Sequence, residues 1–84
     1  MMHDRSRVRI RLTSQAEVMD FIQHLCGVED CFSIENHSGM HRVNAKSIIG
    51  VLYTVFDFAE EMYLVNESHD GQIPDVVSRY LMPA

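Results

Sequence analysis

The sequence predicts an α+β fold in which four strands form one antiparallel sheet and three helices cover one face of that sheet. The chain has 84 residues, of which 46% are hydrophobic and 23% charged, and this composition is typical of one globular domain, residues 1–84. Apolar residues alternate with polar ones in the expected strands and recur with helical spacing in the expected helices. These segments follow in the order β-α-β-β-α-β-α. A helix that is apolar along one side must bury that side, and a sheet face is the economical place for it.

The first strand is expected at 5–12, where arginines alternate with apolar residues. Its two faces would carry Val8, Ile10 and Leu12 on one side and Arg5, Arg7, Arg9 and Arg11 on the other. We expect the arginine face to meet water, with Glu61 and Glu67 as candidate partners if the first and fourth strands are neighbours. The arginine row is also a candidate site for an anion or an acidic protein, although a solvated strand face is its commoner role.

Ser14 is the predicted N-cap of the first helix. A serine followed three residues later by a glutamate, here Glu17, forms a capping box that satisfies free backbone donors. Gly27 can end this helix. The apolar residues at helical spacing between these signals are Val18, Phe21, Ile22 and Leu25.

A β-hairpin and a second helix follow. The hairpin runs from Phe32 to Asn44, with the turn-forming residues Asn-His-Ser-Gly at 36–39. Ser47 is the natural N-cap of the second helix. One helix cannot send all of its apolar residues to the core. The expected buried stripe is Ile48, Val51 and Val55, and the expected exposed apolar patch is Ile49, Leu52 and Tyr53.

The last two elements are a strand and a helix. Met62 and Leu64 alternate with their neighbours in the fourth strand. Asp70 is expected to cap the final helix, and Pro74 is tolerated in its first turn. The apolar stripe expected along that helix consists of Ile73, Val76, Val77, Tyr80 and Leu81.

Charge and cysteine content limit the classes of partner. A formal net charge of −5 disfavours nucleic acid or an anionic membrane as the main partner. The longest apolar stretch, 48–56, is too short to span a membrane. Cys26 and Cys31 are too few for a disulfide scaffold, and their spacing matches no zinc pattern. We therefore expect a cytoplasmic protein with reduced thiols, no metal and no cofactor.

A resemblance to a known family lies in the stretch 43–52, VNAKSIIGVL. It closely resembles the segment around the regulatory serine of HPr, the histidine-containing phosphocarrier of the bacterial phosphoenolpyruvate:sugar phosphotransferase system, and of its Gram-positive relative Crh. The similarity extends from about Thr13 to Leu81, with a longer hairpin at 36–40. It implies an HPr-like open-faced β-sandwich, with four antiparallel strands under three helices.

The chain departs from this family at the phosphorylation site. The first helix of the family opens with Gly-x-His-Ala-Arg-Pro-Ala, in which the histidine accepts phosphate and the arginine assists. Ser14 and Ala16 occupy the positions of that histidine and arginine. A serine hydroxyl without an adjacent base cannot carry a labile phosphoryl group as an imidazole does. We therefore expect that histidine phosphotransfer is lost, as in Crh, and that the chain is not an enzyme.

The resemblance leaves Ser47 as the candidate regulatory site. In the family an ATP-dependent kinase phosphorylates this serine, and the product binds a transcriptional regulator of carbon catabolism. The residues expected to dock on a kinase-like or regulator-like protein are Lys46, Ile48, Ile49, Leu52 and Tyr53. An ordinary helix cap is the simpler role for Ser47. A homodimer through the second helix, a phosphocarrier that uses another residue, and a bare oligomeric scaffold remain as alternatives.

Overall fold

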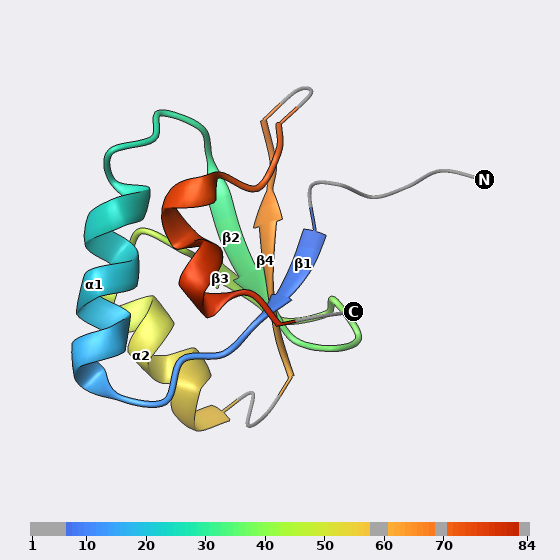
Figure 1. Cartoon of the computed structure of the whole chain (residues 1–84). Helices are drawn as coiled ribbons and strands as arrows, with labels where there is room; N and C mark the ends of the chain where they lie inside the picture. The colour runs from blue at the N-terminus through green and yellow to red at the C-terminus, as the bar shows by residue number, and fades with distance from the viewer. Residues whose placement is uncertain (1–6, 58–60, 69–70, 83–84) are drawn as a thin grey trace.

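In the part of the chain that the structure describes, four strands form one antiparallel sheet in the order β1-β4-β2-β3 (Figure 1). The computed structural model describes residues 7–57, 61–68 and 71–82. The strands are β1 (Arg7–Ile10), β2 (Phe32–Glu35), β3 (Arg42–Asn44) and β4 (Met62–Asn66). The helices are α1 (Gln15–Leu25), α2 (Ile48–Asp57) and the short 3-10 helix η1 (Asp75–Tyr80). The predicted order of elements and the antiparallel sheet are confirmed.

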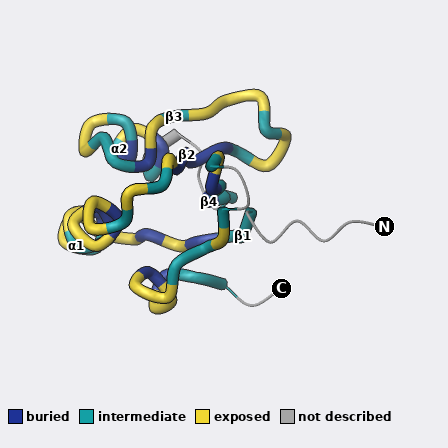
Figure 2. Tube along the Cα trace, turned by 90° about the horizontal axis from the view of Figure 1, so that it is seen from above, coloured by how far each residue is buried: buried dark blue, intermediate teal, exposed yellow. Residues whose placement is uncertain are grey.

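All three helices lie on the same side of the sheet, and the opposite side faces solvent (Figures 1 and 2). This arrangement follows from the strand alternation, because successive side chains of a strand point to opposite faces. On β4, for example, Met62, Leu64 and Asn66 are buried, whereas Tyr63 and Val65 are only half-buried. The buried apolar residues of the sheet therefore meet the helices, as predicted, whereas the polar residues Ser33 and Glu35 are buried on the opposite face.

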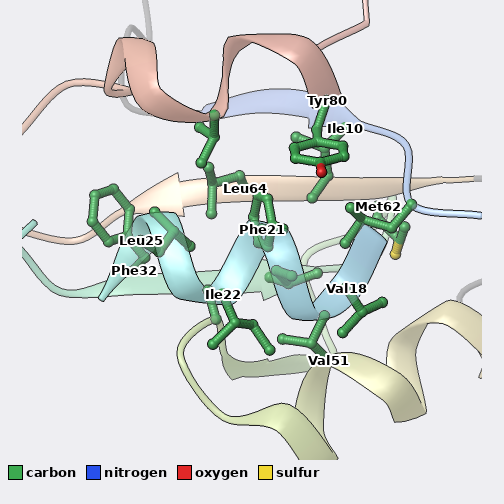
Figure 3. Packing of buried hydrophobic residues seen from close by; sticks show 14 residues of the cluster. Ile10, Val18, Phe21, Ile22, Leu25, Phe32, Val51, Met62, Leu64 and Tyr80 are labelled. Carbon is green, nitrogen blue, oxygen red and sulfur yellow. The ribbon is translucent and has the colours of Figure 1, made fainter. Parts of the chain in front are cut away.

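The core lies between α1 and the sheet and is closed at one end by η1 (Figure 3). Phe21 of α1 and Tyr80 of η1 meet edge to face, with ring centroids 5.7 Å apart and planes at 85°. Leu64 and Ile34 contribute from the two central strands, and Val51 contributes from α2. Each of these large apolar side chains stabilises the fold by about 1.5–3 kcal/mol through removal from water.

The first strand is shorter than the predicted 5–12. It ends at Ile10, and Arg11 and Leu12 lie beyond it, although Leu12 is still buried. The chain's C-terminal segment lies along the outer side of β1, where a bridge joins Ile10 to Leu81. The backbone N–H of Arg11 donates to the carbonyl of Tyr80 at 2.9 Å, so the chain turns toward η1 there. Arg5 lies outside the described residues.

The final helix differs from the predicted α-helix. Helix η1 begins after Pro74 and has three residues per turn, so residues three apart lie on one side. Val77 and Tyr80 satisfy that spacing and are buried, whereas Val76 faces solvent. Ile73 and Leu81 were expected in the stripe, but they flank the helix and are partly buried against the core. The expected cap Asp70 lies outside the described residues.

Candidate functional site

Ser47 caps the N-terminus of α2, as predicted. Its Oγ accepts a hydrogen bond from the backbone N–H of Gly50 at 3.2 Å, and its carbonyl accepts one from Val51 at 2.9 Å. The N–H of Ser47 itself donates to the carbonyl of Asn44 at 3.1 Å, which joins the cap to the end of β3. The first turn of α2 contains no acidic residue. A negative group on Ser47 would therefore meet the positive end of the helix dipole without a competing carboxylate from that turn.

Lys46 precedes this serine but is directed elsewhere. Its Nζ donates to the carbonyl of Val28 at 2.5 Å and lies 5.7 Å from the ring centroid of Phe32. Its backbone N–H donates to Oδ1 of Asn44 at 2.8 Å. Lys46 thus ties the segment after α1 to the junction between β3 and α2. Its position beside Ser47 is as expected, and its ammonium group is bonded to that segment.

The exposed apolar residues at the start of α2 form what we call the α2 face, defined as Ile48, Ile49 and Tyr53. Their exposed fractions are 43%, 82% and 54%, respectively. Ile48 was expected in the buried stripe, and this expectation is wrong. The helix begins at Ile48 as the chain leaves β3, the edge strand of the sheet, so the side chain projects past the covered region.

The buried side of α2 also differs from the predicted stripe. Val51 is fully buried and Val55 is partly buried against the core, as expected. Leu52 was expected in the exposed patch, but it too packs partly against the core. Thr54 is also fully buried, and its hydroxyl donates to the carbonyl of Val51 at 2.7 Å. This bond to the preceding turn satisfies the hydroxyl, so a polar residue can occupy an apolar position.

The start of α1 has a structural role in the described chain. Ser14 accepts a hydrogen bond from the N–H of Glu17 at 3.1 Å, and Ala16 is exposed. The other half of the predicted capping box is shifted by one residue. Glu17 accepts from the N–H and the hydroxyl of Thr13, at 2.8 and 2.9 Å, instead of from the N–H of Ser14. These hydrogen bonds from Thr13 lower the pKa of Glu17. The Glu17 carboxylate is therefore held beside the start of α1.

The described histidines lie away from this helix start. His24 is in the last turn of α1, where its Nδ1 is 2.7 Å from the carbonyl oxygen of Asp20. His37 and His41 belong to the turn between β2 and β3. Among the described residues, no imidazole therefore occupies the position of the family's phosphorylated histidine.

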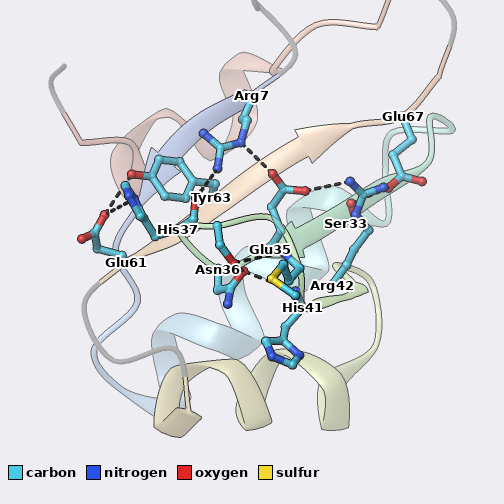
Figure 4. A network of polar contacts seen from close by, with 12 residues as sticks. Arg7, Ser33, Glu35, Asn36, His37, His41, Arg42, Glu61, Tyr63 and Glu67 are labelled. Carbon is cyan, nitrogen blue, oxygen red and sulfur yellow. Dashed lines mark hydrogen bonds and ion pairs between the residues drawn. The ribbon is translucent and has the colours of Figure 1, made fainter.

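On the open face of the sheet, Arg7 of the arginine row is engaged in an ion pair. Arg7 Nε lies 2.7 Å from one carboxylate oxygen of Glu35, and Arg42 lies 2.8 Å from the other (Figure 4). Arg42 also lies 2.7 Å from Glu67, which accepts a hydrogen bond from Ser33 at 2.6 Å. The side chain of Glu35 is only 6% exposed. Acidic partners from this chain already hold Arg7, which weakens the case for an external anion there.

Arg7 pairs with neither of the expected partners, Glu61 and Glu67, because its partner is Glu35. β1 and β4 are neighbours, as the expectation required, but the register pairs Arg7 with Val65 and Arg9 with Tyr63. Arg7 crosses the ring of Tyr63, with its guanidinium carbon 3.9 Å from the ring centroid, to reach Glu35 of β2. Arg11 lies beyond the strand. It lines a hollow of about 400 Å³ together with Thr13, Glu17, Arg79, Tyr80, Leu81 and Met82.

Glu61 takes part in a second contact set at the end of this face. It accepts a hydrogen bond from the hydroxyl of Tyr63 at 3.0 Å and lies 2.9 Å from Nδ1 of His37. The hydrogen bond from Tyr63, with the charges of His37 and Arg9, lowers the pKa of Glu61. Of the arginines for which Glu61 was a candidate partner, Arg9 thus acts on it through its charge.

Sequence reasoning missed Glu35, the most buried carboxylate of the open face. The signal for it was present, because Ser33 and Glu35 alternate with Phe32 and Ile34 along β2 and must therefore share the solvent face. The sequence did not reveal its partners. They depend on which strands flank β2.

Metal ligands and membrane spans were also sought among the described residues. Within 7–57, 61–68 and 71–82 there is no group of three or more histidine, cysteine or acidic residues placed to hold a metal ion. Cys26 and Cys31 are free and exposed thiols. No helix in these ranges has the length and apolar character that crossing a membrane requires.

No protein-family model, curated protein or solved structure matches this chain. The resemblance to HPr therefore stays a prediction from the sequence.

Proposed function

We propose that this chain is a cytoplasmic, HPr-like protein that has lost phosphocarrier chemistry and acts as a regulatory or adaptor module. It would bind partner proteins through Ser47 and the α2 face. The observation that carries the proposal is the exposure of Ile49, at 82%, beside a capping serine whose helix turn has no acidic residue. Exposed apolar groups of this kind are typical of protein interaction sites.

A phosphate on Ser47 would change this surface while the core stays intact. The N-terminus of a helix stabilises an anion through its free N–H groups and its dipole. Ser47 is half-buried, so its modification needs no opening of the core. A dianionic phosphate next to the α2 face would change which proteins bind there. Without phosphate the face favours an apolar partner surface, and with phosphate it favours a partner surface that also carries a cation.

The start of α1 supports the loss of phosphotransfer. The Ser14 hydroxyl accepts a helix N–H, and none of the described histidines lies beside it. The nearby Glu17 carboxylate would repel a second anion. The alternative phosphocarrier, which uses another residue, has no such observation in its favour.

Treatment with an HPr kinase and ATP tests the regulatory half of the proposal. We expect one phosphate, located by mass spectrometry on Ser47, and none on Ser14. Ser14 is an internal control because it is also an N-cap whose Oγ accepts an N–H three residues later. The Ser47→Ala variant should take up no phosphate. Absence of phosphate on Ser47 of the wild type would contradict the proposed regulation through this serine.

Incubation with phosphoenolpyruvate and enzyme I tests the proposed loss of phosphocarrier chemistry. We expect no acid-labile phosphoryl adduct on the chain. An adduct on any histidine would instead support the alternative phosphocarrier.

Self-association is a second candidate function, favoured by the same exposed side chains. Ile48, Ile49 and Tyr53 could pack against their copies in a second chain. Light scattering over a range of concentrations distinguishes a monomer from a homodimer, and a dimer that persists without any partner supports the scaffold alternative.

A further inference from the structure

A hollow of about 310 Å³ lies where β1 and β4 part. The last pair in the ladder of these two strands is Ile10 with Met62, and beyond it the chain leaves β4 and turns toward η1 (Figure 1). The C-terminal segment also borders the hollow, because Met82 lines it and donates its N–H to the carbonyl of Arg9 at 2.9 Å. Sites for small molecules in proteins begin at about this volume.

Four of the residues that line this hollow are apolar, and they form what we call its floor: Ile10, Leu12, Met62 and Met82. The first three belong to the core and are at most 4% exposed, so their positions are fixed by packing. Met82 is half-buried and lies nearer the surface. An apolar group that entered the hollow would cover the part of this floor that still meets water.

The charged residues of the hollow are two arginines, and no carboxylate belongs to its described lining. Arg9 already acts on Glu61 through its charge. Arg11 is exposed, and its guanidinium takes part in none of the ion pairs that join described residues. Arg11 is therefore the principal cation that this hollow offers to an anion.

The other candidate surfaces keep these two features apart. The adjoining hollow of about 400 Å³ shares Arg11, but it also contains Glu17, whose lowered pKa keeps a negative charge there. The α2 face is apolar, and the nearby Lys46 directs its ammonium group to the carbonyl of Val28. The hollow between β1 and β4 combines an apolar floor with a cation and has no described carboxylate in its lining.

We infer that this hollow binds a small organic carboxylate with an apolar chain. The carboxylate would accept two parallel hydrogen bonds from the Arg11 guanidinium, and the chain would lie on the floor. One exposed guanidinium matches one negative charge, which favours a carboxylate over a phosphate dianion. Thus only one end of the expected arginine row would bind an external anion, because Glu35 already holds Arg7. The inference goes beyond the proposed function and uses neither Ser47 nor the α2 face, so either can fail alone.

NMR titration of the full chain with hexanoate tests the site. We expect the amide signals of residues 9–13 and of Met82 to shift, with a dissociation constant of about 1 mM. Acetate, which lacks the apolar chain, and hexanol, which lacks the charge, should each bind about tenfold more weakly. Absence of shifts, shifts that gather on the α2 face, or equal binding of either matched probe overturns the inference. Tighter binding of inorganic phosphate than of hexanoate also overturns it.

Variants assign the two ends of the ligand. Arg11→Gln should weaken hexanoate about tenfold or more, whereas the matched control Arg79→Gln should stay within about twofold of the wild type. Arg79 is also an exposed arginine, at 71%, but it lines only the adjoining hollow. Met82→Ser should weaken hexanoate and leave acetate unchanged. Thermal midpoints check that each variant is folded. Equal losses in both arginine variants, or no loss in Arg11→Gln, overturn the inference.

Discussion

Arg7 Nε and Glu35 Oε1 lie 2.7 Å apart although 28 residues separate them in the chain. The contact joins β1 to β2 across the strand that lies between them, β4. Arg42 of β3 holds the second oxygen of the same carboxylate at 2.8 Å (Figure 4). One carboxylate therefore links both edge strands of the sheet on the face that no helix covers. Because it is almost fully buried, it depends on these two cations for charge compensation.

Substitution of Glu35 by glutamine should destabilise the protein. A neutral amide cannot compensate the charge of two guanidinium groups. We expect the free energy of unfolding to fall by about 2 kcal/mol. This loss is smaller than for a fully buried pair because the Arg42 side chain is half exposed. Urea denaturation measures this difference. The control is Glu61→Gln on the same face, where the carboxylate is 43% exposed. Equal losses for both variants would show that burial of Glu35 is unimportant.

The hydrogen bonds from Thr13 to Glu17 should make stability depend on pH. Because these bonds lower the pKa of Glu17 in the folded chain, their contribution is present above the pKa of the unfolded chain and is lost as pH falls through the folded pKa. We therefore expect the wild type to be more stable than Glu17→Gln at pH 7, with the difference shrinking in acid below about pH 4. Urea denaturation at several pH values tests this, and a difference that grows in acid contradicts it.

Gly71→Ala should be strongly destabilising for a protein of this size. Its Cβ would fall 2.2 Å from Oδ1 of Asn66, a buried amide that bonds Asp30, Ser68 and the carbonyl of Gln72. Either the amide or the backbone must shift, so we expect a loss of about 1–3 kcal/mol. Thermal unfolding provides the measurement. Gly27→Ala, which meets only one backbone oxygen at 3.4 Å, is the control and should change stability little.

Ile49→Glu should separate binding from folding. Because Ile49 is 82% exposed, we expect its free energy of unfolding to change by less than about 0.5 kcal/mol. A charge in the α2 face should nevertheless abolish docking of a partner or of a second copy. Light scattering and titration with an HPr kinase report the loss. Val76→Glu places the same charge on an exposed apolar residue of η1, so equal loss of binding in both variants would falsify the assignment of the α2 face.

Local signals in the sequence were sufficient for much of this fold. Ser14 and Ser47 were predicted as N-caps because their hydroxyls need only a backbone N–H three residues later, and both hydrogen bonds are present. The final helix was predicted as an α-helix and is a 3-10 helix, because the two helix types share part of their apolar spacing and the spacing alone could not distinguish them. The predicted burial of Ile48 was wrong because helical spacing does not reveal where the sheet under the helix ends.

The sequence by itself determined the order of the elements, the serine caps of α1 and α2 and the side of each strand that faces the core, since these depend on residues close together in the chain, whereas Pro74, expected in the first turn of the final helix, is its N-cap. Only the tertiary structure decided that Glu35 lies between Arg7 and Arg42 and that Gly50 lies close to Val43 of β3. The first depends on strand order and register, and the second on how closely α2 approaches β3. Such distances between segments follow from the packing of the whole chain, which no local pattern encodes.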